Sequence, residues 1–182
     1  MDHSESKLVI IIDNNVSNGI YLSACARFAI PDSRVVWLSV NDEASPMLKS
    51  SPTETEHHTL HSLAEAAAFI DREAAQSSNI IIFYNLQLGS FQSSVAKAID
   101  SDVTMSLKEL VKNRYSILVN VHSTELMTRQ VAEAIDPTFK TNPLEAKVIC
   151  HHLITGASPR TIMDIVRATH EEWEERNMEG AR

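Results

Sequence analysis

Short runs of Ile, Val and Leu alternate with helical segments along most of the chain, and this alternation constrains the fold more than any other feature. Each apolar run has the length of one buried strand, and helical patterns occupy the segments between the runs. The predicted strands are Lys7–Asp13, Ser33–Val40, Asn79–Asn85, Tyr115–Val121 and Lys147–Ile154. The predicted helices are Val16–Ile30, Leu63–Ala75, Phe91–Ile99, Ser106–Lys112, Thr124–Ile135 and Ser158–Asn177. We therefore expect an α/β fold with a five-stranded, mainly parallel sheet.

Polar residues end two of the predicted strands. Asp13 and Asn14 close the first strand, and Asn85 closes the third. Right-handed crossovers leave few topologies, and the order of elements agrees with the flavodoxin-like sheet order 2-1-3-4-5. In that order the carboxyl ends of strands one and three lie side by side. Asp13, Asn14 and Asn85 are therefore expected to meet in one crevice.

Length and composition predict one soluble domain. A chain of 182 residues suits a single domain over residues 1–182, with its core from about residue 7 to residue 176. Segment 41–61 is polar and is expected to be a long loop. The net charge of −8 argues against nucleic acid and anionic membranes as partners. Cys25 and Cys150 lie in apolar surroundings, which predicts reduced thiols and a cytoplasmic location.

Four stretches of the chain resemble the receiver domains of bacterial response regulators. They are LVIIIDNNVSNGIYLSACA, FYNLQL, ILVNVHS and VICHHLI, in the order that the family shows. Asp13 matches the first acid of the family's acidic pair, and Asn14 stands in place of the second. Asn85 stands where the family carries its phosphate-accepting aspartate. Asn120 replaces the usual Thr or Ser, and His151 lies where a Lys-Pro pair is expected.

These departures remove the chemistry that the resemblance would imply. An amide is not a nucleophile, and Mg²⁺ prefers anionic oxygen ligands, of which Asp13 alone is left out of three. Phosphoryl transfer depends on positioned charge. The expectation is a phosphorylation-incompetent receiver-like protein without enzymatic activity, metal or cofactor. The polar crevice then has three alternative roles, which are a hydrogen-bonded cap on the strand ends, a ligand site, or residual catalysis.

The resemblance also implies how such a protein acts. Receivers commonly bind partners through their fourth helix, fifth strand and fifth helix, which correspond here to Thr124–Ile135 and Ser158–Trp173. We expect protein–protein interaction in bacterial signalling, with a kinase, a regulator or a second copy of the chain as the partner. The candidate interface residues are Arg160, Arg167 and Trp173. Trp173 is expected to be exposed, because it lies near the end of the last helix, where the sheet should no longer cover it.

A second functional class remains open. The start IIIDNNV is similar to the first strand of PIN-like and NYN-like metal-dependent nucleases, in which an aspartate ends that strand. Asp100 and Asp102 could supply further carboxylates, since such enzymes gather several acids around Mg²⁺ or Mn²⁺. The end of the fourth strand offers no acid. This alternative requires Asp13 to lie beside Asp100 or Asp102.

Two smaller constellations have weaker interpretations. His57, His58 and His61 have a spacing that could bind a metal, but a polar loop exposed to solvent explains them better. Cys150 and His151 could suggest nucleophilic catalysis. Strand alternation places adjacent side chains on opposite faces of a sheet, which argues against this pair.

Overall fold

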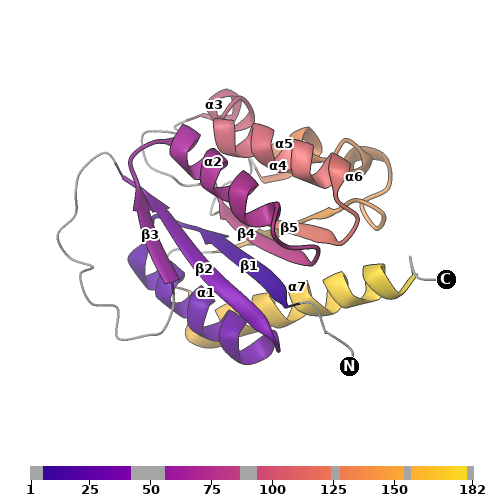
Figure 1. The fold of residues 1–182 in the computed structure, drawn as a ribbon. Coiled ribbons are helices and arrows are strands. Elements are labelled where there is room, and N and C mark those ends of the chain that lie inside the picture. Colours follow the sequence, from indigo (N-terminus) through magenta and orange to yellow (C-terminus); the bar gives the residue numbers. More distant parts are fainter. Residues whose placement is uncertain (1–5, 42–55, 87–93, 124–127, 154–156, 180–182) are drawn as a thin grey trace.

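In the computed structural model the chain forms a six-stranded parallel sheet with helices on both faces (Figure 1). The structure describes residues 6–41, 56–86, 94–123, 128–153 and 157–179. The strands are β1 (Lys7–Ile12), β2 (Ser33–Val40), β3 (Glu56–Leu60), β4 (Ile80–Asn85), β5 (Ile117–Ser123) and β6 (Val148–His152). The helices are α1 (Val16–Ala29), α2 (Leu63–Ala74), α3 (Val95–Ile99), α4 (Asp102–Asn113), α5 (Thr128–Ile135), α6 (Thr138–Thr141) and α7 (Pro159–Glu179).

The strand order is β3-β2-β1-β4-β5-β6. The predicted α/β class and parallel sheet are confirmed, and the five predicted strands are neighbours in the predicted order. The predicted number of strands is wrong, because β3 adds a sixth strand beside β2. The order reverses direction between β1 and β4, which places the topological switch point at the carboxyl ends of these two strands.

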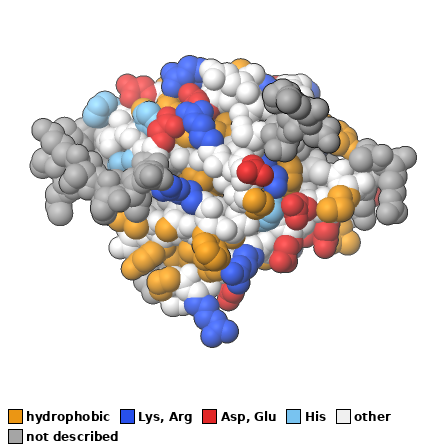
Figure 2. Space-filling view, turned by 60° about the horizontal axis from the view of Figure 1, so that its bottom comes forward, with side chains coloured by type: hydrophobic (Ala, Val, Ile, Leu, Met, Phe, Trp, Pro, Cys, Tyr) orange, Lys and Arg blue, Asp and Glu red, His pale blue; other side chains and the backbone are white. Residues whose placement is uncertain are grey.

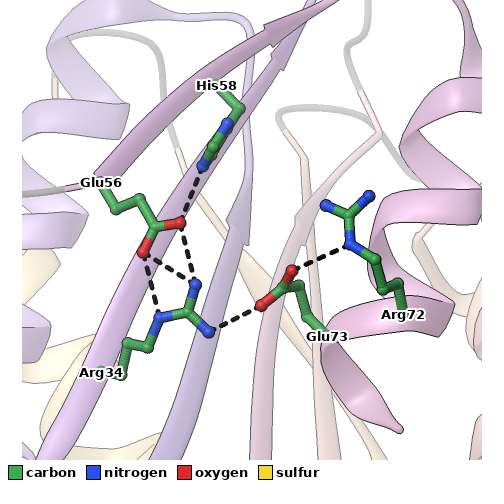
Figure 3. Close-up of polar contacts among 5 residues, drawn as sticks. All are labelled: Arg34, Glu56, His58, Arg72 and Glu73. Atoms are coloured by element: carbon green, nitrogen blue, oxygen red, sulfur yellow. Dashed lines mark hydrogen bonds and ion pairs between the residues drawn. The ribbon is translucent and has the colours of Figure 1, made fainter. Parts of the chain in front are cut away.

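Strand β3 corrects the prediction that segment 41–61 is a loop throughout, although residues 42–55 lie outside the described residues. Ion pairs fasten this polar strand to its neighbours (Figure 3). Arg34 of β2 donates to both carboxylate oxygens of Glu56 at 2.9–3.0 Å and to Glu73 of α2 at 2.6 Å. His58 also contacts Glu56, at 2.9 Å. Pairing with β2 therefore makes a strand from residues whose own pattern does not indicate one.

The two faces of the sheet have separate apolar cores. Helices α2 to α6 cover one face and α1 and α7 cover the other (Figure 1). The first face buries side chains such as Ile10, Ile82 and Val119. The second buries Ile11 and Phe83, which occupy the alternate positions of β1 and β4. Because successive side chains of a strand point to opposite faces, strands that are covered on both sides read as continuous apolar runs.

Helix α1 packs unusually close to β2. A Cβ atom added to Gly19 would lie 2.1 Å from the Trp37 ring, so this glycine makes room for the indole. The Trp37 Nε1–H donates to the backbone carbonyl of Asp13 at 2.8 Å. The side chain of Asn15 caps the helix by accepting from the backbone N–H of Asn18 at 3.0 Å. These contacts fix the turn between β1 and α1, from which Asp13 projects.

Helix α7 lies along the second face of the sheet, next to α1 (Figure 1). The prediction that Trp173 is exposed is wrong, because only 7% of this residue is accessible to solvent. The sheet still covers the helix at this point, and Lys7 of β1 places its ammonium 5.2 Å from the centre of the indole. Among the described residues, no helix has the length and apolarity needed to span a membrane.

Candidate functional site

A row of polar side chains crosses the sheet at its carboxyl edge, on the face covered by α1 and α7. Asn85, His122 and His151 are register partners on β4, β5 and β6. Asp13 directly follows β1 and contacts Asn85. The structure therefore brings together three of the predicted crevice residues, Asp13, Asn85 and His151. It adds His122, which the sequence reasoning did not select.

Asp13 lies at the centre of this row and is completely buried. Its Oδ1 accepts from the Asn85 amide at 2.9 Å and from the backbone N–H of Asn15 at 2.8 Å. Its Oδ2 lies 3.4 Å from Nε2 of His122. Both carboxylate oxygens thus have protein partners within the fold. A buried carboxylate satisfied in this way is a structural hydrogen-bond centre before it is an open ligand for a cation.

Asn14 does not enter the row, which corrects the expectation that it lies in the crevice. Its side chain instead turns to the end of β2. Its amide donates to the Val40 carbonyl at 2.6 Å, and its Oδ1 accepts from the Val40 N–H at 2.7 Å. The paired bonds hold the end of β1 against β2. They also occupy the position where a second crevice acid would have been needed.

Asn120 lies one layer deeper, beneath α7. Its amide donates to the Thr169 hydroxyl at 2.7 Å and to Nδ1 of His151 at 3.0 Å. Because the Thr169 hydroxyl donates to the Ile165 carbonyl, it must accept from Asn120. His151 accordingly carries its proton on Nε2. Burial lowers the pKa of His151, and neighbouring His122 lowers it further, so His151 is neutral at physiological pH.

The chemistry open to this arrangement centres on His122. With Nε2 turned toward Asp13, its Nδ1 is buried and has no hydrogen-bond partner among the described residues. Carboxylate–histidine pairs of this kind orient a base. However, Ser123 and Cys150 occupy the alternate positions of β5 and β6, which point to the other face. Burial also raises the pKa of the Cys150 thiol to about 11, which keeps it protonated.

The metal-binding alternatives find no support in the described part of the chain. It contains no group of three or more His, Cys, Asp or Glu residues arranged to hold a metal ion. Asp100 caps the end of α3 and Asp102 lies in the first turn of α4, both in the helical layer across the sheet from Asp13. The juxtaposition that a nuclease centre needs is therefore not formed by these residues.

The three histidines considered as metal ligands are separated by their secondary structure. His57 and His58 are consecutive residues of β3, and His61 follows the strand. His57 stacks on Trp37 with ring centres 3.9 Å apart, on the α1 side of the sheet. His58 packs against Phe69 of α2, on the other side. Neighbouring residues of one strand cannot converge on a single ion.

Comparison with known proteins gives a likeness of fold and no family. No known family matches the chain, and neither does any curated protein. Among solved structures, BdcA (YjgI) from E. coli superimposes with a TM-score of 0.56 at 10% sequence identity, covering 91% of this chain and 94% of that one. At this identity the likeness shows the fold alone.

This match corrects one expectation from the receiver resemblance. We expected the chain to have no enzymatic activity, because receiver chemistry had been lost. BdcA belongs to an NAD(P)-binding oxidoreductase-like family, so the fold that the chain shares is one that enzymes use. The fold therefore gives no ground for excluding an activity, and the likeness does not point to a receiver domain.

The same strand order is that of dinucleotide-binding folds, in which glycines let the backbone after β1 approach a pyrophosphate. Here Asp13, Asn14 and Asn15 form that turn, and Asn14 and Asn15 use their side chains within it. Gly19 is occupied by its contact with Trp37. These residues do not fit a dinucleotide, and we derive no chemistry through one.

Proposed function

We propose that the chain is a phosphorylation-incompetent, receiver-like protein that acts by binding another protein in a bacterial signalling or regulatory circuit in the cytoplasm. Two features support the receiver-like interpretation. The strands β2-β1-β4-β5-β6 keep the flavodoxin-like order, with β3 as an addition. The position of the phosphate acceptor holds Asn85, and this amide is used to bind the buried Asp13.

The observation that carries the proposal is an apolar outer surface on α1. Val16, Tyr21 and Phe28 are 46%, 41% and 75% exposed, although the opposite side of the same helix is buried in the second core. Figure 2, which turns the side of α1 and α7 forward, shows hydrophobic side chains gathered on this face. Exposed aromatic residues grouped on one helix are typical of protein contact surfaces.

The charges around this surface distinguish it from the rest of the chain. Helix α1 contains no acidic residue and presents Arg27 to solvent, in a chain with a net charge of −8. The predicted interface residues Arg160 and Arg167 are exposed on the neighbouring helix α7. Arg167 lies close enough to Cys25 of α1 to offset part of the pKa increase that burial gives this thiol. The surface therefore suits a partner that presents apolar and acidic side chains.

The interface differs from the one expected from the resemblance. Trp173, the predicted anchor, is buried, whereas the exposed aromatic residues lie on α1. The two arginines remain candidates because α7 packs beside α1. A kinase, another regulator and a second copy of the chain all remain candidate partners.

Substitution of the exposed aromatic residues tests the proposal. Phe28→Ser and Tyr21→Ser should leave the melting temperature nearly unchanged, since neither side chain belongs to a core. They should weaken self-association or partner capture by about 1–3 kcal/mol. Met105→Ser is the matched control, because Met105 is 49% exposed on α4, across the sheet. Sedimentation of the purified protein and quantitative pull-down provide the readouts. Equal association of all three variants and the wild type would refute this interface.

A further inference from the structure

A small pocket opens at the amino edge of the sheet, at the opposite end of the strands from Asp13. It is lined by residues at the starts of β5 and β6, by the segment before β6 and by the last turns of α7. Tyr115, Leu118 and Leu144 form apolar walls, and Trp173 and Arg176 line it from α7. The volume of the pocket is about 220 Å³.

Two hydrogen-bond donors of this lining have no partner among the described residues. They are the indole Nε1 of Trp173 and the Nη1 of Arg176, and both atoms are buried. Trp173 as a whole is more than nine-tenths buried. The remaining nitrogens of Arg176 are engaged, since Nε donates to Glu172 at 2.7 Å and Nη2 reaches the Pro143 carbonyl at 3.5 Å. Buried donors are rarely left unpaired, so this pair calls for an acceptor.

The chemistry of the lining defines that acceptor. Two N–H donors, one of them on a guanidinium, select an anionic oxygen pair, and a carboxylate fits a guanidinium best. The Lys147 ammonium is turned away, because it donates to the carbonyls of Val111 and Arg114 at 3.1 and 2.6 Å. Glu145 also lines the pocket, and its negative charge disfavours a second charge on the ligand.

We propose that this pocket binds a small monocarboxylate with an apolar, preferably aromatic, body. An apolar cavity of about 150 Å³ accepts benzene, so the observed space accommodates a ring together with a carboxylate. The carboxylate contacts Nε1 of Trp173 and Nη1 of Arg176, while the ring lies between Tyr115 and the leucines. This site is separate from the row around Asp13 and from the α1 surface, and it does not depend on the proposed function.

Benzoate and the two tryptophan indoles provide the test. Trp37 serves as an internal reference, because its Nε1–H already donates to the Asp13 carbonyl and its ring is buried. In a ¹⁵N-labelled full-length chain, titration with benzoate should shift one indole Nε1–H resonance downfield, and that resonance should be the one missing from Trp173→Phe. The Trp37 resonance should stay in place. Benzyl alcohol, which has the ring without the carboxylate, should bind at least tenfold more weakly.

Arg176→Gln and a matched control on the same helix complete the experiment. Arg176→Gln should raise the dissociation constant for benzoate about tenfold or more, because it removes a hydrogen bond to a charged group. Arg160→Gln, at the exposed start of α7, should leave it unchanged. The proposal is overturned if benzoate moves neither indole resonance or moves only that of Trp37. It is equally overturned if Arg176→Gln binds like the wild type, or if benzyl alcohol binds as well as benzoate.

Discussion

The contact between Gly19 and Trp37 makes the sharpest prediction about how this fold is held together. Replacing a helical glycine with alanine normally stabilises a helix by about 1 kcal/mol. At Gly19 the added Cβ would lie 2.1 Å from Cε2 and 2.3 Å from Cζ2 of the Trp37 ring. Both atoms belong to a buried ring with little room to shift. The clash should therefore outweigh the gain in helix propensity.

The magnitude follows from two costs. Overpacking of a well-filled core costs about 1–3 kcal/mol, and displacement of the indole loses its hydrogen bond to the Asp13 carbonyl, about 0.5–1.5 kcal/mol. After subtracting the propensity gain, Gly19→Ala should lower the free energy of unfolding by about 1–3 kcal/mol. For a chain of this size each kcal/mol changes the melting temperature by about 2–4 °C.

Urea denaturation followed by circular dichroism measures this loss, and a double-mutant cycle identifies its source. In a Trp37→Phe background the smaller ring leaves space, so Gly19→Ala should cost at least about 1 kcal/mol less than in the wild type. Ala24→Gly, at an exposed position of the same helix, reports the propensity term alone. The reasoning is refuted if Gly19→Ala is as stable as the wild type, or if its cost is the same in both backgrounds.

Three further predictions concern the candidate site and the edge of the sheet. Incubation with acetyl phosphate and Mg²⁺ should give no phosphorylated species by intact mass, and a stoichiometric adduct that Asn85→Ala abolishes would contradict this. RNA and DNA incubated with Mn²⁺ should be cleaved no faster than by Asp13→Ala, and a loss of cleavage specific to that variant would instead favour a nuclease. The Arg34 hydrogen bond lowers the pKa of Glu73 below its usual 4.5, so this pair stabilises the fold above pH 4.5 and the contribution is lost as the pH falls through the lowered pKa. Glu73→Gln should cost about 0.5–1 kcal/mol at pH 7, since Arg34 is partly solvent-screened, and the difference in melting temperature should vanish at low pH, whereas Glu109→Gln should cost nothing at either pH.

The sequence determined the strands of the sheet interior. The predicted Ser33–Val40 coincides with β2, and Lys7–Asp13 extends one residue beyond β1. These strands are covered on both faces, so each must be apolar at successive positions, and such runs are visible without a structure. The N-cap of the last helix was also predictable, since Ser158 accepts from the backbone N–H of Thr161 at 3.2 Å.

Features that depend on a neighbour distant in sequence required the tertiary structure. Strand β3 is polar and exists because β2 supplies its hydrogen bonds and Arg34 its ion pairs. His122 faces Asp13 only because β4 and β5 bring their ends to the same edge as β1.

Trp173 shows the same limit. Its helical position indicated where it lies along α7, but how far the sheet continues beneath that helix set its burial. Local patterns record which residues must avoid water, because every covered strand needs apolar side chains whatever its partner is. Which polar groups meet, and which apolar surfaces stay uncovered, is decided by packing between segments far apart in the chain.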